Sequence, residues 1–421
     1  PGRVLVVDKR TYQIGGLFAP TKDWVKPAQY FMSRPQTKKA IFRCDDCGWF
    51  GFENDLRNDR CPFCNSTVQE DLPMIRPWGF GAVGGYSQEL SDNRDIYTHA
   101  STPQYSTLPA DIDDMKSDPW PNGHMRMAFR SNQQIIMRNE GCRGFTLCPN
   151  CGAAVPGEKL DSKFPKPYLP PSYRNREVCH HSDAFNVSLG FDFITDMLVF
   201  EINLDDPAIN LDTADREWIL RAGQTLAEAL RLSASELLDI DFTELVTGYR
   251  RRGACIDVYL YDALSSGAGY AVALEPLHQK LLDHVRTLLT HCSCSTACQN
   301  CLRHFRNQHV NRLLDRQSGM ELLNWATDST LPATLSLEKA LSLINPITSV
   351  LENYGIHIST VNGTLTVSDG GKILPIEVVP AMLDKSALTR TTETIFVNEG
   401  HLRFSRPDAV EAIKKHFIPM S

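Results

Sequence analysis

The spacing of apolar residues in the middle of the chain predicts a sheet covered by helices. Apolar residues alternate with others from Val187 to Phe193, as in a half-buried strand, and the apolar run Met197–Ile202 continues it. Residues 213–232 have the spacing of an amphipathic helix. The other predicted elements are strands at 245–249 and 255–261 and helices at 270–289, 301–316 and 320–325. This order predicts an α/β fold with a mixed-sheet core.

The first third of the chain is less regular. Short strands are predicted at 4–7 and 12–17. Residues 70–130 combine Pro, Gly and Asp residues with little periodicity and are predicted to form a long irregular loop.

The last part of the chain has a pattern of its own. A helix is predicted at 336–353, kinked or interrupted at Pro346. Asn362-Gly363 stands between two alternating runs, which is a strong hairpin signal. Strands at 373–379 and 394–397 and a helix at 407–417 complete a small α+β C-terminal module.

Composition limits the class of protein. The 421 residues are 42% hydrophobic and have a formal net charge of -7, so a sizeable core can form and any nucleic-acid surface must be a local patch. No apolar run approaches the ~18 residues that span a bilayer, and no signal peptide is recognisable. We therefore expect a cytoplasmic protein without a membrane partner.

Four cysteines within ten residues provide the clearest chemical signal. Cys292, Cys294, Cys298 and Cys301 follow the spacing C-x-C-x3-C-x2-C, directly after the long predicted helix. Thiolates this close together suit a tetrahedral zinc ion. Disulfides or free thiols are the alternative, but disulfides are rare in a reducing cytosol.

A second set of cysteines has zinc-ribbon spacing. Cys44-x2-Cys47 and Cys61-x2-Cys64 are separated by thirteen residues, with Gly48 and Pro62 providing turns. Two such pairs at this separation predict a second four-thiolate site. Both sites have four protein ligands and are therefore expected to be structural rather than catalytic.

A third pair predicts a further site whose ligands are harder to assign. Cys148-x2-Cys151 carries the same turn-forming residues, and Cys179 is the next cysteine. His180 is the predicted fourth ligand, and His181 or Cys142 could close the site instead. About three zinc ions per chain are therefore expected.

Basic residues gather after the last cluster. Arg303, Arg306, Arg312 and Arg316 follow it, and Arg251 and Arg252 form a second basic spot. Arginines held by a zinc site can contact phosphates. The alternative is a solvated or internally paired surface, with Asp315 pairing with Arg312.

A glycine-rich turn is a weaker candidate. Gly267 and Gly269 lie between a predicted strand and a predicted helix, where main-chain N–H groups can hold a phosphate. Tight packing of the strand against the helix explains these glycines equally well.

Catalytic motifs are absent from the sequence. Gly370-Gly371-Lys372 lacks the spacing and the hydroxyl residue of a phosphate loop, and no Walker B pair ends a strand. Asp369, Lys372 and Glu377 could belong to a metal nuclease, but a solvated hairpin is the simpler interpretation.

Several of these motifs together resemble one known family. The cysteine cluster with Leu302, followed by Asn307-Gln308-His309 and Leu314-Asp315-Arg316, resembles the MrfA-type zinc-binding domain. Gly144-Phe145 before Cys148 and the Gly267-Ala268-Gly269 turn also resemble that family. The resemblance covers roughly residues 40–326. It is strongest to the helicase, or the companion zinc protein, of antiphage defence systems such as Druantia or DISARM.

The resemblance implies a function. It implies a zinc-stabilised DNA-binding and scaffold region of a DEAD/DEAH-type superfamily 2 helicase. ATP would then be used only by a motor N-terminal to this chain or on a partner chain, and other defence-system subunits are expected partners. The alternative is a zinc scaffold that docks a helicase or defence partner without contacting nucleic acid.

Taken together, the patterns predict an α/β mixed-sheet core with inserted zinc ribbons, a helix leading into a four-cysteine cluster, and an α+β module. The expected segments are 1–70 with the first ribbon, 71–185 with the second knuckle, 186–327 as the α/β zinc-binding domain, and 328–421 as the C-terminal module.

Overall fold

The structure, a computed structural model, forms two compact units. One contains residues 1–110, 131–196 and 264–268, and the other residues 111–130, 197–263 and 269–421. The residues that the structure describes are 4–7, 10–18, 37–82, 88–89, 104–109, 120, 123–141, 143–149, 152–157, 184–212, 215, 217–308, 310–388 and 393–417.

The first unit begins with a small antiparallel sheet. Strand β2 (Arg10–Phe18) pairs with β1 (Val4–Val7), β6 (Gly79–Ala82) and β7 (Gln88–Glu89). The fully buried Leu17 of β2 belongs to an apolar cluster that also contains Ile75, Phe145 and Val187. This small sheet is thereby packed on the rest of its unit.

The segment that contains the first four cysteines is held by β3 (Lys38–Arg43), which pairs with β4 (Phe50–Gly51) and β5 (Gln69–Ile75). A 3₁₀ turn follows β4 at Glu53–Asp55. Strands β5 to β8 (Gln104–Ser106) and the start of β9 (Met125–Asn139) lie within residues 69–130. The expected irregular loop over 70–130 is therefore wrong where the structure describes it, because pairing with distant strands orders a sequence without strong periodicity.

A 19-residue strand, β12 (Phe185–Asn203), connects several parts of the main sheet. Its first residues pair with β10 (Phe145–Leu147) and, in parallel, with β5. Strand β11 (Ala154–Pro156) extends β10, and β9 pairs with both β8 and β12. The mixed sheet predicted from the sequence is confirmed.

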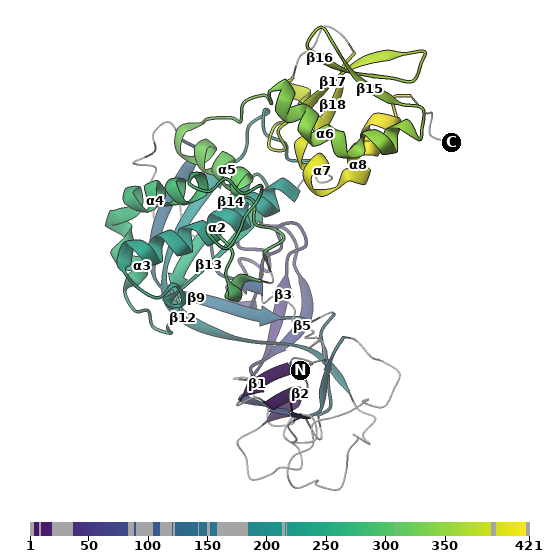
Figure 1. The fold of residues 1–421 in the computed structure, drawn as a ribbon. Helices are drawn as coiled ribbons and strands as arrows, with labels where there is room; N and C mark the ends of the chain where they lie inside the picture. The colour runs from purple at the N-terminus through teal and green to yellow at the C-terminus, as the bar shows by residue number, and fades with distance from the viewer. Residues whose placement is uncertain are drawn as a thin grey trace. The chain divides into compact units, whose positions relative to one another are not determined.

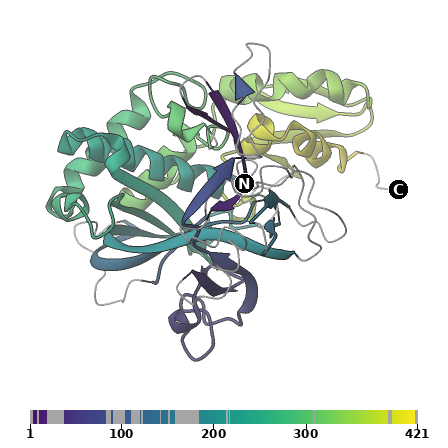
Figure 2. The ribbon, with the colours of Figure 1, turned by 90° about the horizontal axis from the view of Figure 1, so that it is seen from below.

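In the second unit, the last residues of β12 pair with β14 (Cys255–Asp262), and β14 pairs with β13 (Leu245–Arg252). Helices α2 (Glu217–Leu238), α4 (His278–Thr290) and α5 (Arg316–Asp328) pack with these strands, as Figures 1 and 2 show from two sides. Helix α2 continues through Ser233 and Ser235, beyond residue 232, where the predicted helix ends. The hydroxyl of Ser235 donates to the Arg231 carbonyl, so it is satisfied inside the helix.

Two helix predictions near the cysteine cluster need correction. The predicted helix 270–289 is divided into α3 (Tyr270–Leu274), a 3₁₀ turn (Glu275–Leu277) and α4, because Pro276 lacks the N–H that a continuous helix needs. The predicted helix 301–316 is wrong: turns and a 3₁₀ segment (Phe305–Asn307) occupy it, and α5 starts only at Arg316.

The C-terminal residues form a small α+β layer structure. Helix α6 (Leu337–Glu352) precedes a sheet in the order β15 (His357–Val361), β16 (Thr364–Ser368), β17 (Ile373–Val379) and β18 (Ile395–Asn398). The hairpin at Asn362-Gly363 is confirmed, with both residues at positive φ. Strand β18 runs parallel to β17 and leads into α7 (Glu399–Phe404) and α8 (Arg406–Lys414). Ile344, Val367 and Ile395 are fully buried in a core of its own.

Candidate metal centres

The first four-cysteine group comes together as predicted. The sulfur atoms of Cys44, Cys47, Cys61 and Cys64 all lie within 4.8 Å of one another. Cys44 and Cys64 are 3.4 Å apart at sulfur, and Cys47 and Cys61 are 3.5 Å apart. These distances exceed the ~2.05 Å of a disulfide and approach the ~3.8 Å edge of a tetrahedron with Zn–S bonds of ~2.3 Å. The group therefore fits zinc.

Two identical main-chain turns present these sulfurs. The N–H of Cys44 donates to the Trp49 carbonyl at 2.8 Å, and the Gly48 N–H donates back to the Cys44 carbonyl at 2.9 Å. In the second turn, the N–H of Cys61 donates to the Ser66 carbonyl, and the Asn65 N–H donates back to the Cys61 carbonyl, at 3.0 Å each. Gly48 and Asn65 have φ of 72° and 60°, a conformation that glycine and asparagine tolerate best.

The main chain at Cys148 forms the same two hydrogen bonds. The N–H of Cys148 donates to the Ala153 carbonyl at 2.8 Å, and the Gly152 N–H donates to the Cys148 carbonyl at 3.0 Å, with Gly152 at φ 77°. The main chain at Cys148 is thus folded as at the two knuckles of the first group. The other predicted ligands and alternatives lie outside the described residues: Cys142, Cys151, Cys179, His180 and His181.

The second complete group follows helix α4. Among Cys292, Cys294, Cys298 and Cys301, the sulfur-to-sulfur distances are 3.6 Å for Cys292–Cys298 and 3.8 Å for both Cys294–Cys301 and Cys298–Cys301. The N–H of Cys298 also points at the Cys301 sulfur, at 3.1 Å. This donor set fits zinc, which would join the end of α4 to the turns before α5.

Ionisation differs between the thiols. Main-chain and side-chain hydrogen bonds from Cys294 lower the pKa of Cys292 to about 7, whereas burial raises the pKa of Cys301 to about 12. A buried thiol keeps its proton unless a cation replaces it. Zinc is such a cation, and it binds the thiolate form.

Arg316 lies inside the second group. Its Nε donates to the Cys294 sulfur at 3.3 Å, and its terminal nitrogens donate to the carbonyls of Leu289 at 2.6 Å and Cys294 at 2.5 Å. All three nitrogens of its guanidinium are therefore used within the protein. This geometry favours a structural role over the phosphate contact predicted from the sequence.

Arg251 and Arg252 are also engaged. Arg252 forms ion pairs with Glu201 and, at 3.0 Å, with Asp257. Arg251 donates to the carbonyls of Gly253 at 3.1 Å and Leu211 at 3.4 Å. Their positions agree with an internally paired surface.

The arginines closest to the cluster differ in exposure. Arg306 and Arg312 are exposed, whereas Arg303 is partly buried and reaches the Thr296 hydroxyl at 3.5 Å. The pairing of Arg312 with Asp315 is not formed, because Asp315 binds Arg403 instead. Contact of Arg303, Arg306 and Arg312 with nucleic acid stays a prediction.

The glycine-rich turn already has an internal anion. The fully buried carboxylate of Asp262 accepts from the N–H groups of Gly269 at 2.7 Å, Tyr270 at 3.2 Å and Ala271 at 2.9 Å. The donors that a phosphate would need at the start of α3 are thus occupied. The Gly267 N–H donates to the Leu264 carbonyl at 3.0 Å. The packing interpretation of Gly267 and Gly269 is favoured.

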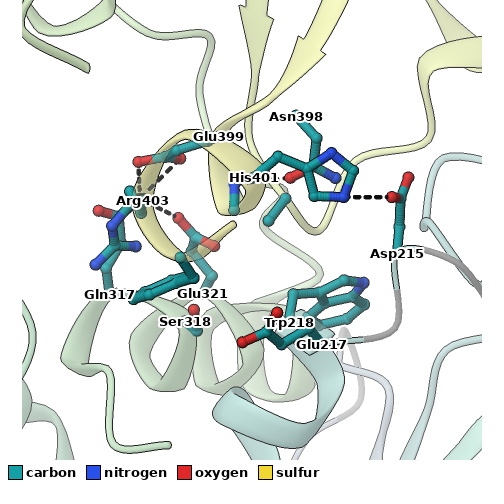
Figure 3. A pocket seen from close by; sticks show the side chains of 13 residues that line it. Asp215, Glu217, Trp218, Gln317, Ser318, Glu321, Asn398, Glu399, His401 and Arg403 are labelled. Atoms are coloured by element: carbon teal, nitrogen blue, oxygen red, sulfur yellow. Dashed lines mark hydrogen bonds and ion pairs between the residues drawn. The ribbon is translucent and has the colours of Figure 1, made fainter. Parts of the chain in front are cut away.

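A polar pocket that the sequence analysis missed lies between α2, α5 and α7 (Figure 3). His401 pairs with Asp215 at 2.8 Å, and Arg403 pairs with Asp315 at 2.5 Å. Gln317 donates to the buried Glu399 at 3.0 Å. These residues come from segments far apart in the chain, so no local pattern could have indicated them.

The residues considered for a nuclease form a turn. The Asp369 carboxylate accepts from the N–H groups of Gly371 at 3.0 Å and Lys372 at 2.8 Å. The Lys372 ammonium pairs with Glu393 at 2.9 Å. This arrangement agrees with the solvated hairpin.

Similarity to known proteins agrees with the second cysteine group. Residues 226–302, which include all four of its cysteines, match the family model of the MrfA Zn-binding domain. The chain therefore carries an MrfA-type Zn-binding domain, as its sequence pattern predicted. Among the described residues, no helix is long and apolar enough to cross a membrane.

The chain is also similar to an individual defence protein over nearly its whole length. It is 30% identical to the Druantia protein DruE of Escherichia coli (strain UMEA 4076-1) over an alignment of 453 positions, gaps included, which covers 99% of this chain and 24% of DruE. The chain thus spans about a quarter of the length of that relative. A crystal structure of the DUF1998 helicase MrfA bound to DNA has a TM-score of 0.33 at 14% identity, covering 53% of this chain and 24% of MrfA.

Proposed function

We propose that this chain is the zinc-stabilised, DNA-binding region of a superfamily 2 helicase of antiphage defence. The observation that carries the proposal is the four-thiol group Cys292–Cys301 within an MrfA-type Zn-binding domain, in a chain similar to DruE over 99% of its residues. The ATPase motor would be supplied in cis or by a partner chain.

Zinc would act here as a structural clamp. The first group joins the two knuckles between β3 and β5, and the second joins the end of α4 to the turns before α5. Zinc would cross-link the turns of each segment, so metal binding would add to the folding free energy. The repeated turn at Cys148 supports a third ion.

DNA contact would fall on the exposed cations near the second group. Arg306 and Arg312 are exposed, whereas Arg316, Arg251 and Arg252 are engaged within the protein. A net charge of -7 leaves such contact to a local patch. The expected binding is backbone-directed and weakly dependent on base sequence.

The test is salt-dependent DNA binding by the zinc-loaded chain. Arg306→Ala and Arg312→Ala should each weaken binding and reduce the slope of log K against log salt by about one. Lys280→Ala is the matched control, because Lys280 is an exposed cation near the start of α4, away from the cluster. Unchanged slopes in both arginine variants would rule out these contacts.

A protein-docking scaffold is the second candidate. The chain covers only 24% of DruE. The rest of a protein of that length is a possible binding partner for such a scaffold. Zinc-loaded protein that binds no DNA at low salt, but binds a helicase motor at high salt, would favour this function.

A further inference from the structure

Phe305 is the most exposed large apolar side chain among the residues that the structure describes, at 83%. It lies four residues after Cys301, in the 3₁₀ turn Phe305–Asn307. A phenylalanine side chain that stays in water forgoes about 1.5–3 kcal/mol of the stabilisation that its burial would give. Its exposure beside the exposed Arg306 makes Phe305 a candidate residue for contact with a ligand.

The turn that carries Phe305 is fixed on both sides. Asn307, only 2% exposed, donates to the Leu302 carbonyl at 2.8 Å and accepts from the His304 N–H at 2.9 Å. The His304 ring accepts from the Arg306 N–H at 3.2 Å and meets Glu228 of α2 at 2.6 Å. The main chain is therefore held while the Phe305 ring projects outward.

The neighbours of Phe305 indicate what it meets. Arg306 and Gln308 are exposed, and the Arg306 guanidinium lies 6.0 Å from the ring centre of Phe242. A protein-docking surface normally offers a contiguous apolar patch of several hundred Å². A single aromatic ring beside a cation instead matches the surfaces on which unpaired bases stack.

We propose that Phe305 is a stacking platform for an unpaired base of single-stranded DNA, with Arg306 contacting the adjacent phosphate. This assignment rests on the proposed DNA-binding function and specifies its substrate as a single strand. Stacking requires a π face and no particular hydrogen-bond pattern, so the contact would be insensitive to base identity.

The test compares zinc-loaded wild-type protein with Phe305→Ala and Phe305→Trp. The probes are a 12-residue oligothymidylate, the same strand with one 2-aminopurine, and a duplex of equal length. We expect Phe305→Ala to weaken single-strand binding about tenfold or more without changing its salt slope. Phe305→Trp should retain the affinity and still quench the 2-aminopurine. The control is Ile373→Ala, which removes another exposed apolar side chain.

The outcomes separate the two proposals. Equal single-strand affinity of wild type and Phe305→Ala would overturn the stacking role while leaving DNA binding intact. An equal loss on the duplex would overturn the assignment to an unpaired base. Wild-type protein that binds neither probe at low salt would overturn the DNA-binding function and the stacking role with it.

Discussion

Arg316 donates a hydrogen bond to the sulfur of Cys294, 22 residues earlier in the chain, at 3.3 Å. Its two terminal nitrogens donate to the main-chain carbonyls of Leu289 and Cys294. The guanidinium thus links the end of α4, the cysteine cluster and the start of α5. A cation beside thiolates also offsets part of their negative charge.

Replacing Arg316 should damage the zinc site and not a DNA contact. Arg316→Ala leaves two partly buried carbonyls and a thiolate without their donor, which costs about 2–4 kcal/mol. We expect a lower unfolding midpoint and faster zinc loss to a chelator. Arg312→Ala, which removes an exposed neighbouring arginine, should leave both unchanged. Retention of zinc at the wild-type rate would contradict the structural role.

The ion pair of Arg403 and Asp315 should hold α7 against the cysteine loop. Asp315 is fully buried, accepts from Ser318 at the start of α5 and binds both terminal nitrogens of Arg403. Removing one partner of a buried pair costs about 3–5 kcal/mol. Arg403→Ala should therefore accelerate amide exchange in α5 and α7. Arg406→Ala, an exposed arginine on α8, is the control, and equal exchange in the two variants would argue against the pair.

Zinc content should be three ions per chain, and single cysteine replacements should remove them one at a time. Cys47→Ser, Cys148→Ser and Cys298→Ser are each expected to lose about one ion. Cys255→Ser, which lies in neither four-thiol group, should lose none. Metal analysis of the purified proteins checks this. Two ions in wild type, with no change in Cys148→Ser, would eliminate the third site.

The pocket of Figure 3 should make stability fall as the pH rises. Burial raises the pKa of Glu321 to about 7, and the nearby Glu399 and Asp315 add to the effect although Arg403 opposes it. The folded state therefore binds the proton more tightly than the unfolded state, so stability declines between about pH 4.5 and pH 7. Glu321→Gln should be more stable than wild type at pH 8 by about 3 kcal/mol and similar to it near pH 4.5.

Denaturant unfolding at the two pH values measures this difference. Glu338→Gln, at an exposed position of α6, is the control and should follow wild type. An identical pH profile for Glu321→Gln and wild type would show that Glu321 ionises normally.

The pair of His401 and Asp215 should add to the same trend. The hydrogen bond from His401 to Asp215 raises the pKa of His401 and lowers that of Asp215. The stability due to His401 is complete below its ordinary pKa of about 6.5 and is lost as the pH rises through the raised value. His401→Gln should lose stability at pH 6 and little at pH 9. A loss of equal size at both values would exclude charge as the cause.

What the sequence predicted well depends on local spacing. The two four-cysteine groups, the Asn362-Gly363 hairpin and strands β13 and β14 follow from residues close together in the chain. The division of the predicted helix 270–289 also has a local signal, because Pro276 interrupts a continuous helix.

What the sequence did not predict depends on distant partners. Strand β5 has Pro73 and little alternation, and its order comes from pairing with β3 and β12. The role of Arg316 depends on a cysteine 22 residues away, and that of Arg403 on residues about 90 to 110 positions away. Charge and spacing alone cannot distinguish an arginine that faces solvent from one whose guanidinium donates to groups within the protein.

The hydrogen bond from Arg403 to the Ser295 carbonyl joins residues that are 108 positions apart. At about 5–20 residues per second, a ribosome adds Arg403 roughly 5–20 s after Ser295. During that interval, the loop between Cys294 and Cys298 is without its last main-chain partner. Zinc binding during synthesis would then precede the packing of α7 against this loop. A shortage of zinc would therefore affect the nascent chain before it affects the finished protein.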